Sequence, residues 1–479
     1  MATQSKKITR PNKTNPDIFI ISLGCPRNLV DSEVLIGKLK EKKFRIRYNF
    51  SRLWRDPEES HREKLHSGKK HCIAIVNTCG FIEDAKSESI DTILELVDLK
   101  KQGDLASLIV TGCLSQRFPR DIMKEIKEID AVFGSGTFQE IPHYIDKILN
   151  GEKPIIIDKT PRFLYNHRSP RCIMTPKHTV YVKIQEGCKN RCTYCVIPKI
   201  RGPYRSRSMN SVLNEIHSLR KSGAKEINLI GQDTTFYGMD RYKTLMLATL
   251  LRKASQIMKS GWIRLLYTHP AHYNRDLIEV IKNEPNICKY LDLPIQHISD
   301  RILKRMNRHV TKKDIITLIE KLRKDIPGIA IRTSIIIGFP GESDKEFNEL
   351  EKFLKEIRFD RLGAFIYSRE EGTRAFDFGG QVPDKEKHRR FKRIMELQKN
   401  ISFENNKAHL GRFVKVLIDE KDFTESNQYL GRTEHDAPDV DGLVYVKSKI
   451  PRRPGDFINV KIEDVLEYDL VGSAEGRVG

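Results

Sequence analysis

The stretch GCKNRCTYC, residues 187–195, places Cys188, Cys192 and Cys195 within eight positions of a chain that has nine cysteines. A structural zinc site usually has four ligands, and this trio has no obvious fourth partner nearby in the sequence. Cubane iron–sulfur clusters ordinarily take four thiolates, so three thiolates would leave one iron free to bind another group. The spacing therefore favours a catalytic iron–sulfur cluster, with zinc binding and inert core cysteines as the alternatives.

The residues around this motif predict a barrel-like α/β domain. From Thr179 to about Tyr367, six apolar strand patterns alternate with helical patterns, and the first of them, TVYVKIQE, directly precedes the motif. Regular alternation with right-handed crossovers favours a partial (β/α) barrel. The cysteine trio then lies at the carboxyl end of the first strand, where the active sites of such barrels are found.

The N-terminal part of the chain predicts a second α/β domain with a parallel sheet, because short apolar runs alternate with amphipathic stretches from Ile18 to about Asn150. Three of these runs end on a cysteine, namely Cys25, Cys79 and Cys113. The carboxyl ends of parallel strands lie along one edge of a sheet, so the three cysteines could meet there. The alternative is that each cysteine is buried separately.

The last part of the chain predicts a small antiparallel β-barrel of OB type. Short strand patterns such as RFVKVLID, GLVYVK and FINVKIEDV alternate with turn residues from about Gly411 to Val471. The fold class is therefore α/β with an added β-barrel. The expected segments are a disordered basic tail over residues 1–15, an N-terminal domain over 16–152, a central core over 174–404 and the small barrel over 407–473.

The composition indicates a folded, multidomain protein with a polyanionic partner. The chain has 479 residues, of which 39% are hydrophobic, and its net charge of +21 points to RNA or a ribonucleoprotein. Nine cysteines are too few for a disulfide scaffold and suit a reducing compartment. We find no apolar run that could cross a bilayer and no apolar segment behind the basic first residues, so we expect a cytoplasmic protein without a membrane partner.

The motif Cys-x-x-x-Cys-x-x-Cys after the first strand of a βα series resembles the radical S-adenosylmethionine (SAM) superfamily. The resemblance implies that Cys188, Cys192 and Cys195 hold a 4Fe-4S cluster whose free iron chelates the amino and carboxylate groups of SAM. It also implies a one-electron cleavage of SAM that yields a 5′-deoxyadenosyl radical. No ordinary acid or base side chain can break an unactivated C–H bond homolytically, so a cofactor must carry this chemistry.

A second motif of the superfamily suggests further contacts with SAM. The stretch SIIIGFPGESD resembles the superfamily's cofactor-contacting glycine motif and so implicates Gly338, Gly341 and Glu342. Gln232 ends the second strand of the series and is a further candidate. Glycines that serve turn geometry and a polar residue that caps the next helix are the alternatives.

Three N-terminal stretches, SLGCPRNLVDSE, VNTCGFIEDA and VTGCLSQ, resemble the methylthiotransferase family of radical SAM enzymes. The resemblance implies that Cys25, Cys79 and Cys113 hold a second, auxiliary 4Fe-4S cluster that delivers sulfur. The C-terminal barrel resembles the TRAM domain of that family. The cofactors implied are thus two 4Fe-4S clusters and SAM, whereas catalytic side chains are not identified.

Within this family, four stretches resemble the RimO branch: SLGCPRNLVDSE, GQDTTFYG, YLDLPIQHISDRILKRMNR and GRTEHDAPDVDGLVYV. The resemblance implies methylthiolation at the β-carbon of an aspartate in the small-subunit ribosomal protein S-twelve, free or in the assembling ribosome. It also implies a reductant protein such as flavodoxin or ferredoxin. Two alternatives remain open: a tRNA adenosine methylthiotransferase of the MiaB branch, and a non-catalytic iron–sulfur RNA-binding protein.

The charge of the C-terminal barrel bears on this choice. Residues 411–470 contain nine Lys or Arg and thirteen Asp or Glu. An acidic barrel should repel tRNA phosphates and favour a basic ribosomal protein, although a solvated acidic face is the simpler interpretation. Ribosomal RNA contact is expected instead through basic surfaces elsewhere, for example the helix over 384–399 or the tail with Lys6, Lys7 and Arg10.

Overall fold

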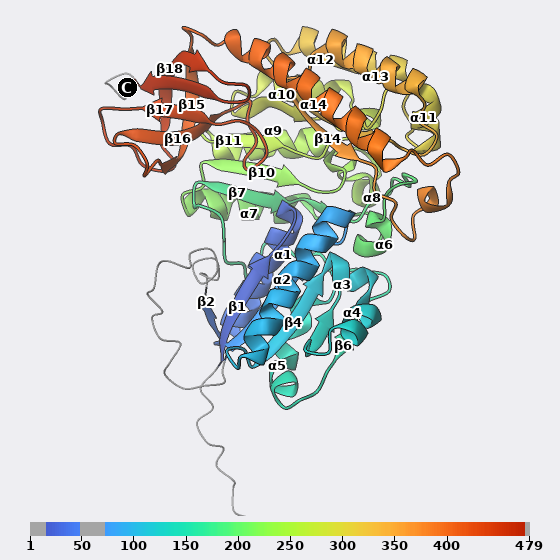
Figure 1. Cartoon of the computed structure of the whole chain (residues 1–479). Helices are drawn as coiled ribbons and strands as arrows, with labels where there is room; N and C mark the ends of the chain where they lie inside the picture. Colours follow the sequence, from blue (N-terminus) through green and yellow to red (C-terminus); the bar gives the residue numbers. More distant parts are fainter. Residues whose placement is uncertain (1–15, 48–71, 475–479) are drawn as a thin grey trace, which may run out of the picture. The chain divides into compact units, whose positions relative to one another are not determined.

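The computed structural model describes residues 16–47 and 72–474 (Figure 1). These residues form two compact units. The smaller contains the described residues up to Pro161 together with Ser169–Cys172, and the larger contains Arg162–Arg168 and the residues from Ile173 onward. The tail predicted over residues 1–15, and nearly all of the long span between Phe50 and Ile73, lie outside the described residues. The four predicted segment boundaries stay predictions.

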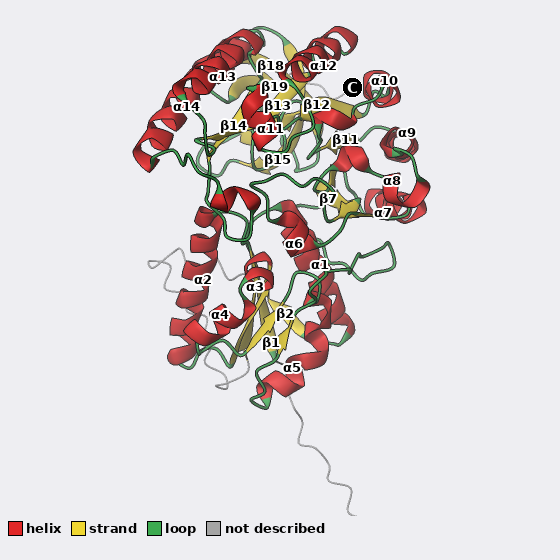
Figure 2. Ribbon diagram, turned by 90° about the vertical axis from the view of Figure 1, so that its right-hand side faces the viewer, coloured by secondary structure: helices red, strands yellow, loops and turns green. Residues whose placement is uncertain are grey.

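The smaller unit is built on a six-stranded sheet with the order β2-β1-β3-β4-β5-β6, in which each neighbouring pair is parallel. Figure 2 shows α1 and α5 along one face of this sheet and α2 and α4 along the other. The strands are β1 (Asp17–Ser22), β2 (Arg45–Arg47), β3 (Cys72–Thr78), β4 (Ser107–Gly112), β5 (Ala131–Phe133) and β6 (Ile155–Ile156). The helices are α1 (Pro26–Glu41), α2 (Glu83–Lys101), α3 (Cys113–Arg117), α4 (Pro119–Glu125), the short η2 (Phe138–Glu140) and α5 (Ile141–Leu149).

The central strands of this sheet are mainly apolar because helices cover both faces. Ile73, Ile75, Leu108 and Val110 are all fully buried. Parallel strands that are buried on both faces have near-continuous apolar sequences, which is the pattern found here. The predicted N-terminal parallel α/β domain is confirmed.

The larger unit begins with an open six-stranded sheet with the order β14-β13-β12-β11-β10-β7, again with parallel neighbours. Its strands are β7 (Thr179–Lys183), β10 (Glu226–Ile230), β11 (Trp262–Leu265), β12 (Ile287–Asp292), β13 (Ala330–Ile337) and β14 (Arg361–Ile366). The short pair β8 (Gln185–Glu186) and β9 (Arg205–Ser206) lies beside the cysteine loop. The open sheet confirms the predicted partial barrel.

Helices cover the apolar face of this sheet. The connections also include the short α6 (Ile197–Arg201), η3 (Thr234–Phe236), α8 (Met239–Tyr242), η4 (Pro270–His272) and η5 (Arg374–Asp377). The helices whose side chains pack in the core are α7 (Met209–Lys221), α9 (Leu247–Met258), α10 (Arg275–Asn283), α11 (Asp300–Arg305), α12 (Lys312–Asp325) and α13 (Asp344–Ile357). Side chains alternate along each strand, so Ile227 and Leu229 of β10 pack into the core with these helices. Glu226 and Asn228 therefore lie on the opposite face of the same strand.

The chain then continues through α14 (Asp384–Lys407), which packs against β14, into a closed five-stranded barrel. The barrel strands are β15 (Phe413–Lys421), β16 (Gln428–Thr433), β17 (Val444–Lys447), β18 (Phe457–Val465) and β19 (Leu470–Ala474). Four pairings are antiparallel and the β17–β19 pairing is parallel. The predicted small barrel is confirmed. In the described parts of the chain, every helix is too short or too polar to span a membrane.

Candidate active site

The smaller unit brings Cys25, Cys79 and Cys113 together at the carboxyl edge of its sheet. Cys25 directly precedes α1, Cys79 follows β3, and Cys113 begins α3 after β4. Burial raises the pKa of the Cys79 thiol to about 12, and the neighbouring Cys113 and Cys25 thiols add to this rise. Bound iron would supply the positive charge that stabilises the thiolate of Cys79 and those of its neighbours.

Asn28, on the first turn of α1, joins the three strand ends that carry these cysteines. Its amide Nδ2 donates to the carbonyl oxygens of Leu23 (3.0 Å) and Thr78 (2.9 Å), which precede Cys25 and Cys79 respectively. The Cys113 thiol donates to Asn28 Oδ1 at 3.6 Å. Asn28 is fully buried, so its hydrogen bonds fix the relative positions of the three cysteines.

Two glycines allow the close approach of these strand ends. Gly24 has a φ of +82°, and a Cβ atom there would lie 2.7 Å from Cys79 Cβ and 3.0 Å from Cys79 Sγ. A Cβ atom on Gly80 would lie 2.6 Å from Leu114 Cα. Side chains at these positions would therefore displace the cysteines, which explains why glycine precedes Cys25 and follows Cys79.

The second trio lies on the loop after β8 in the larger unit, and its loop is held from several sides. Cys195 N donates to Cys192 O at 3.1 Å within the loop. Asn190 Nδ2, between the first two cysteines, donates to Asp233 Oδ2 at 2.8 Å. Gly187 has a φ of +76°, and a Cβ atom there would lie 2.1 Å from Pro203 O. These contacts fix the conformation of the cysteine loop.

Asp233 follows β10 and also contacts two groups beyond the loop. His272 Nδ1 lies 3.0 Å from Asp233 Oδ2, and Thr235 Oγ1 donates to Asp233 Oδ1 at 2.6 Å. Burial alone would raise the pKa of Asp233, but the contacts with His272, His269 and Thr235 lower it. The ionised carboxylate therefore connects the cysteine loop to the 268–272 segment, a connection that sequence reasoning missed.

Glu186, immediately before the loop, is part of a buried ionic cluster. Lys183 and Gln232 both donate to its carboxylate, and Arg201 Nη1 lies 3.6 Å from Glu186 Oε2. Burial alone would raise the pKa of Glu186, but Lys183, Arg201 and Gln232 lower it to about 2. Gln232 Oε1 is buried and has no hydrogen-bond partner among the described residues. A buried acceptor without a donor suits a site that a polar ligand completes.

The residues of the second candidate motif lie on the turn after β13. Gly338 and Gly341 have φ values of +72° and +86°, and Gly338 N donates to Glu342 Oε2 at 2.9 Å. Arg390 of α14 donates to Glu342 Oε1 at 2.7 Å. His297 Nε2 lies 3.5 Å from Glu342 Oε2. The carboxylate of Glu342 therefore stabilises this glycine turn from inside the protein.

The groups present fit iron–sulfur clusters and SAM in their chemistry. Each trio offers soft thiol ligands, and the Gln232 amide offers a polar atom near the loop. Among the described residues, no group of three His, Cys, Asp or Glu side chains could hold a single metal ion. A cubane takes one thiolate per iron, so its ligands stand around the cluster and do not converge on one atom.

Three arginines follow the loop, Arg201, Arg205 and Arg207, and guanidinium groups suit carboxylates. Arg207 is instead buried, contacts Glu215 and lies over the Tyr165 ring at 4.2 Å. Arg201 is buried beside Glu186, and Arg205 donates to the carbonyl oxygens of its neighbours Pro203 and Arg201. Each of these contacts is made within the protein.

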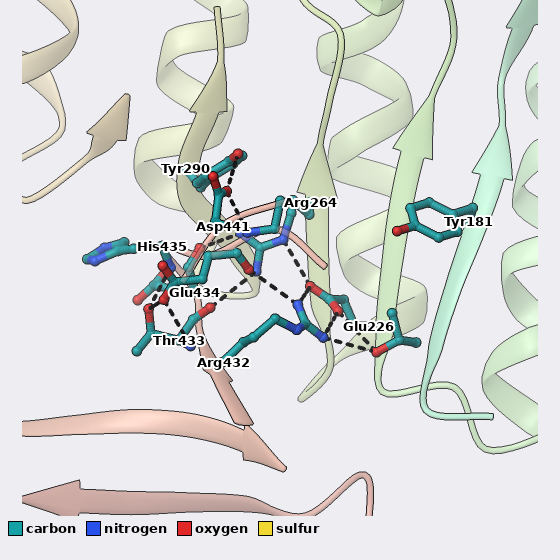
Figure 3. Close-up of polar contacts among 12 residues, drawn as sticks. Tyr181, Glu226, Arg264, Tyr290, Arg432, Thr433, Glu434, His435 and Asp441 are labelled. Atoms are coloured by element: carbon teal, nitrogen blue, oxygen red, sulfur yellow. Dashed lines mark hydrogen bonds and ion pairs between the residues drawn. The ribbon is translucent and has the colours of Figure 1, made fainter. Parts of the chain in front are cut away.

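A further buried network joins the C-terminal barrel to the amino-terminal end of the core strands (Figure 3). On the barrel side, the network is formed by Arg432 and by residues 433–441, which we call the barrel loop. Arg264 Nη1 donates to Glu434 O at 2.6 Å, Tyr290 OH donates to Asp441 Oδ2 at 2.7 Å, and Arg361 Nη2 lies 2.6 Å from Asp436 Oδ1. The stretch GRTEHDAPDVDGLVYV, one of the four quoted for the family resemblance, therefore makes contacts inside the protein.

This network reduces the acidic excess of the barrel surface. The side chains of Asp436 and Asp441 are 3% and 2% exposed and are paired with Arg361 and Arg332 of the core. Asp419 is paired with His178 of the core and with Arg432 of the barrel itself. Two of the thirteen acidic residues, Asp436 and Asp441, are thus paired with core arginines, so the argument that the barrel repels RNA is weaker than the sequence count suggests.

Comparison with known proteins agrees with this architecture. Residues 182–354 match the Radical SAM superfamily, residues 410–474 match the TRAM domain, and residues 17–134 match the Uncharacterized protein family UPF0004. A solved structure of the radical SAM methyltransferase TsrM from Kitasatospora setae is similar in fold. It has a TM-score of 0.52 and 13% identity and covers 74% of this chain and 75% of its own. The fold and the site thus define a radical SAM enzyme.

Full-length relatives give the family. The chain is 45% identical over 95% of its length to ribosomal protein uS12 methylthiotransferase RimO of Desulforamulus reducens, covering 99% of that protein. It is 46% identical over 95% of its length to the protein of the same name in Caldicellulosiruptor saccharolyticus, again covering 99% of it. The chain belongs to the RimO family of radical SAM methylthiotransferases.

Proposed function

We propose that this protein replaces a β-carbon hydrogen of an aspartate in ribosomal protein uS12, the small-subunit protein S-twelve, with a methylthio group. The observation that carries the proposal is the 45% identity over 95% of the chain with relatives named uS12 methylthiotransferases. Two separate cysteine trios support the same reaction, because hydrogen abstraction and sulfur delivery need different groups.

In this proposal each trio holds one 4Fe-4S cluster. Cys188, Cys192 and Cys195 bind the cluster that works with SAM, and the N-terminal trio binds the auxiliary cluster. When bound, these groups would supply the radical that removes a hydrogen atom and the sulfur that replaces it, and a second SAM would donate the methyl group to that sulfur. Catalytic side chains beyond the ligands are not assigned.

The chain's own residues shape the SAM site. In this proposal the turn with Gly338 and Gly341, which both have positive φ values, contacts SAM, and Glu342 keeps that turn in place through Gly338 N and Arg390. Gln232 is oriented by its bond to Glu186, which leaves Gln232 Oε1 to accept a hydrogen bond from the ligand. The Glu186 carboxylate stays ionised and so holds Lys183 and Arg201 beside the loop.

The proposed substrate sets the partners and the location. A ribosomal protein substrate places the enzyme in the cytoplasm, with free uS12 or the assembling ribosome as its partner. Basic surfaces of a chain with net charge +21 would contact ribosomal RNA. A small electron-transfer protein such as flavodoxin or ferredoxin would reduce the cluster.

Variants of the two trios test the division of roles. Protein loaded anaerobically with iron and sulfide is supplied with SAM, a reductant and a uS12 peptide. We expect Cys188→Ala to abolish release of 5′-deoxyadenosine, and Cys79→Ala to retain that release but lose methylthiolation. Equal loss of 5′-deoxyadenosine from both variants would contradict the assignment.

One observation favours a tRNA substrate as the second candidate. The overall charge of +21 suits a nucleic acid, and the pairing of two barrel acids with core arginines lessens repulsion of phosphates. Supplying the loaded enzyme with unmodified tRNA in place of the uS12 peptide separates the two candidates. Formation of a methylthioadenosine would favour the tRNA branch.

A further inference from the structure

The middle of the cysteine loop is attached to the segment that ends α11, residues 305–308. Thr193 N donates to Met306 O at 3.0 Å, and Thr193 Oγ1 donates to Arg305 O at 2.9 Å. Asn307 Nδ2 donates to Arg191 O at 2.9 Å. These three hydrogen bonds lie on either side of Cys192 in the sequence, so this cysteine is fixed against the 305–308 segment.

The last residue of this segment, Arg308, brings a buried guanidinium group close to Cys192. Arg308 is only 8% exposed; burial alone would lower its pKa, but the neighbouring Tyr194 and Cys192 side chains raise it. Its Nη2 donates to Pro294 O, and its backbone N donates to Leu303 O at 2.9 Å. Arg308 Nε is buried without a hydrogen-bond partner among the described residues. A buried cation with an unused donor is costly unless a negative group lies beside it.

Tyr194 also lies close to Cys192. Burial and the neighbouring Cys192 thiol raise the pKa of Tyr194, and its ring packs edge-on against Phe339 at a centroid distance of 6.4 Å. Phe339 is fully buried and belongs to an apolar cluster with Met306 and Tyr367. The Tyr194 hydroxyl is therefore held in place by packing.

We propose that Arg308, together with Tyr194, is a positioning residue that raises the reduction potential of the iron–sulfur cluster bound by Cys188, Cys192 and Cys195. The inference rests on the proposed function only in taking these cysteines as cluster ligands. Reduction adds one electron from an external one-electron donor, so the cluster becomes more negative by one charge. A nearby cation and hydrogen bonds to a ligand sulfur stabilise that added charge and make reduction easier.

The test measures the potential of this cluster alone. Cys25, Cys79 and Cys113 are replaced by alanine in the full chain, so that only the second trio binds a cluster. The remaining cluster is assembled anaerobically, and its reduced form is followed by electron paramagnetic resonance during a dithionite titration. The variants are Arg308→Gln, Arg308→Lys and Tyr194→Phe. Arg275→Gln is the control, because the Arg275 side chain is 84% exposed on α10.

We expect Arg308→Gln to lower the ratio of reduced to oxidised cluster at least tenfold at a fixed potential. For a one-electron couple this corresponds to a midpoint potential about 59 mV more negative. Arg308→Lys keeps the charge but loses the planar fork, so it should lie between wild type and Arg308→Gln. Tyr194→Phe should shift in the same direction by less, and the control should not shift.

An iron-loaded Arg308→Gln protein with the wild-type potential would overturn the inference and leave Arg308 a purely structural residue. If Arg308→Gln assembles no cluster, Tyr194→Phe decides, and an unchanged potential in that variant overturns the inference. Failure of the proposed function would give a different result from failure of this inference. In that case uS12 would stay unmodified, while the variants would still show the expected midpoint potentials.

Discussion

Arg432 of the C-terminal barrel donates to Glu226 Oε2 in the core sheet at 2.8 Å, and the two side chains are 3% and 0% exposed. Glu226 Oε1 also accepts from Arg264 Nε at 2.9 Å (Figure 3). The carboxylate therefore lies between two guanidinium groups, one from the core sheet and one from the barrel. A buried charge network joins these two parts of the larger unit.

Removing the shared carboxylate should strongly destabilise the larger unit. Glu226→Gln leaves Arg264 and Arg432 buried without their common counter-ion, and loss of one partner of a buried pair costs about 3–5 kcal/mol. We expect a loss of this size in the free energy of unfolding, measured by guanidinium titration with fluorescence of Trp262. Trp262 is suited to this measurement because it packs on Phe457 of the barrel at a centroid distance of 4.8 Å.

Glu279→Gln is the matched control for this prediction. Glu279 pairs with Arg275 on the surface of α10, where the two side chains are 51% and 84% exposed. Exposed ion pairs contribute about 0–1 kcal/mol, so this variant should unfold nearly as wild type does. Equal effects of the two substitutions would contradict the importance of the buried network.

The same carboxylate predicts a dependence of stability on pH. Burial alone would raise the pKa of Glu226, but Arg432 and Arg264 lower it from 4.5 to about 2. A pKa that is lower in the folded state stabilises the fold above the unfolded value and loses this effect as pH falls. The difference in stability between wild type and Glu226→Gln should therefore be constant above about pH 5 and shrink between pH 4.5 and 2. Burial raises the pKa of Asp441, so this group acts in the opposite sense and makes the comparison of variants necessary.

Gly24 should be required for the N-terminal cluster although it is not a ligand. Gly24→Ala would place a Cβ atom 2.7 Å from Cys79 Cβ, so the alanine should displace Cys79 and reduce iron binding at that trio. Gly103→Ala is a matched control, because Gly103 has a similar φ of +86° but open space around its Cβ position. Wild-type iron content in Gly24→Ala would contradict the importance of the contact with Cys79, and an equal loss of iron in Gly103→Ala would assign the effect to backbone strain.

Measurements of iron content should show that the six cysteines bind two separate clusters. Cys79→Ala and Cys192→Ala should each lose about half of the iron and acid-labile sulfide of the loaded protein, because each removes one cluster. Cys172→Ala should retain all of it, since this cysteine belongs to neither trio. Loss of all iron from either single variant would contradict two separate sites.

The sequence predicted the three-part fold and the two cysteine trios because both depend on short-range patterns. The succession of strands and helices along the chain follows from alternating apolar and amphipathic stretches. Cys25, Cys79 and Cys113 share an edge of the sheet because parallel strands end on the same side. The binding of iron and SAM by the predicted residues stays a prediction.

Contacts between distant side chains could not be predicted in this way. Arg432 and Glu226 are 206 positions apart, and nothing in the periodicity of either segment indicates the partner. An arginine in a loop is usually exposed, whereas Arg207 is buried, and its pairing with Glu215 becomes evident only after β9 and α7 are placed. Asn28 was missed for the same reason, since its partners lie in three different strand ends.

Mass spectrometry of uS12 and of bulk tRNA nucleosides, from cells with and without this gene, tests the central claim most directly. We predict that deletion of the gene removes a methylthio group from a uS12 aspartate and leaves methylthioadenosine in tRNA unchanged. Loss of the methylthioadenosine with uS12 unaffected would contradict the proposed substrate.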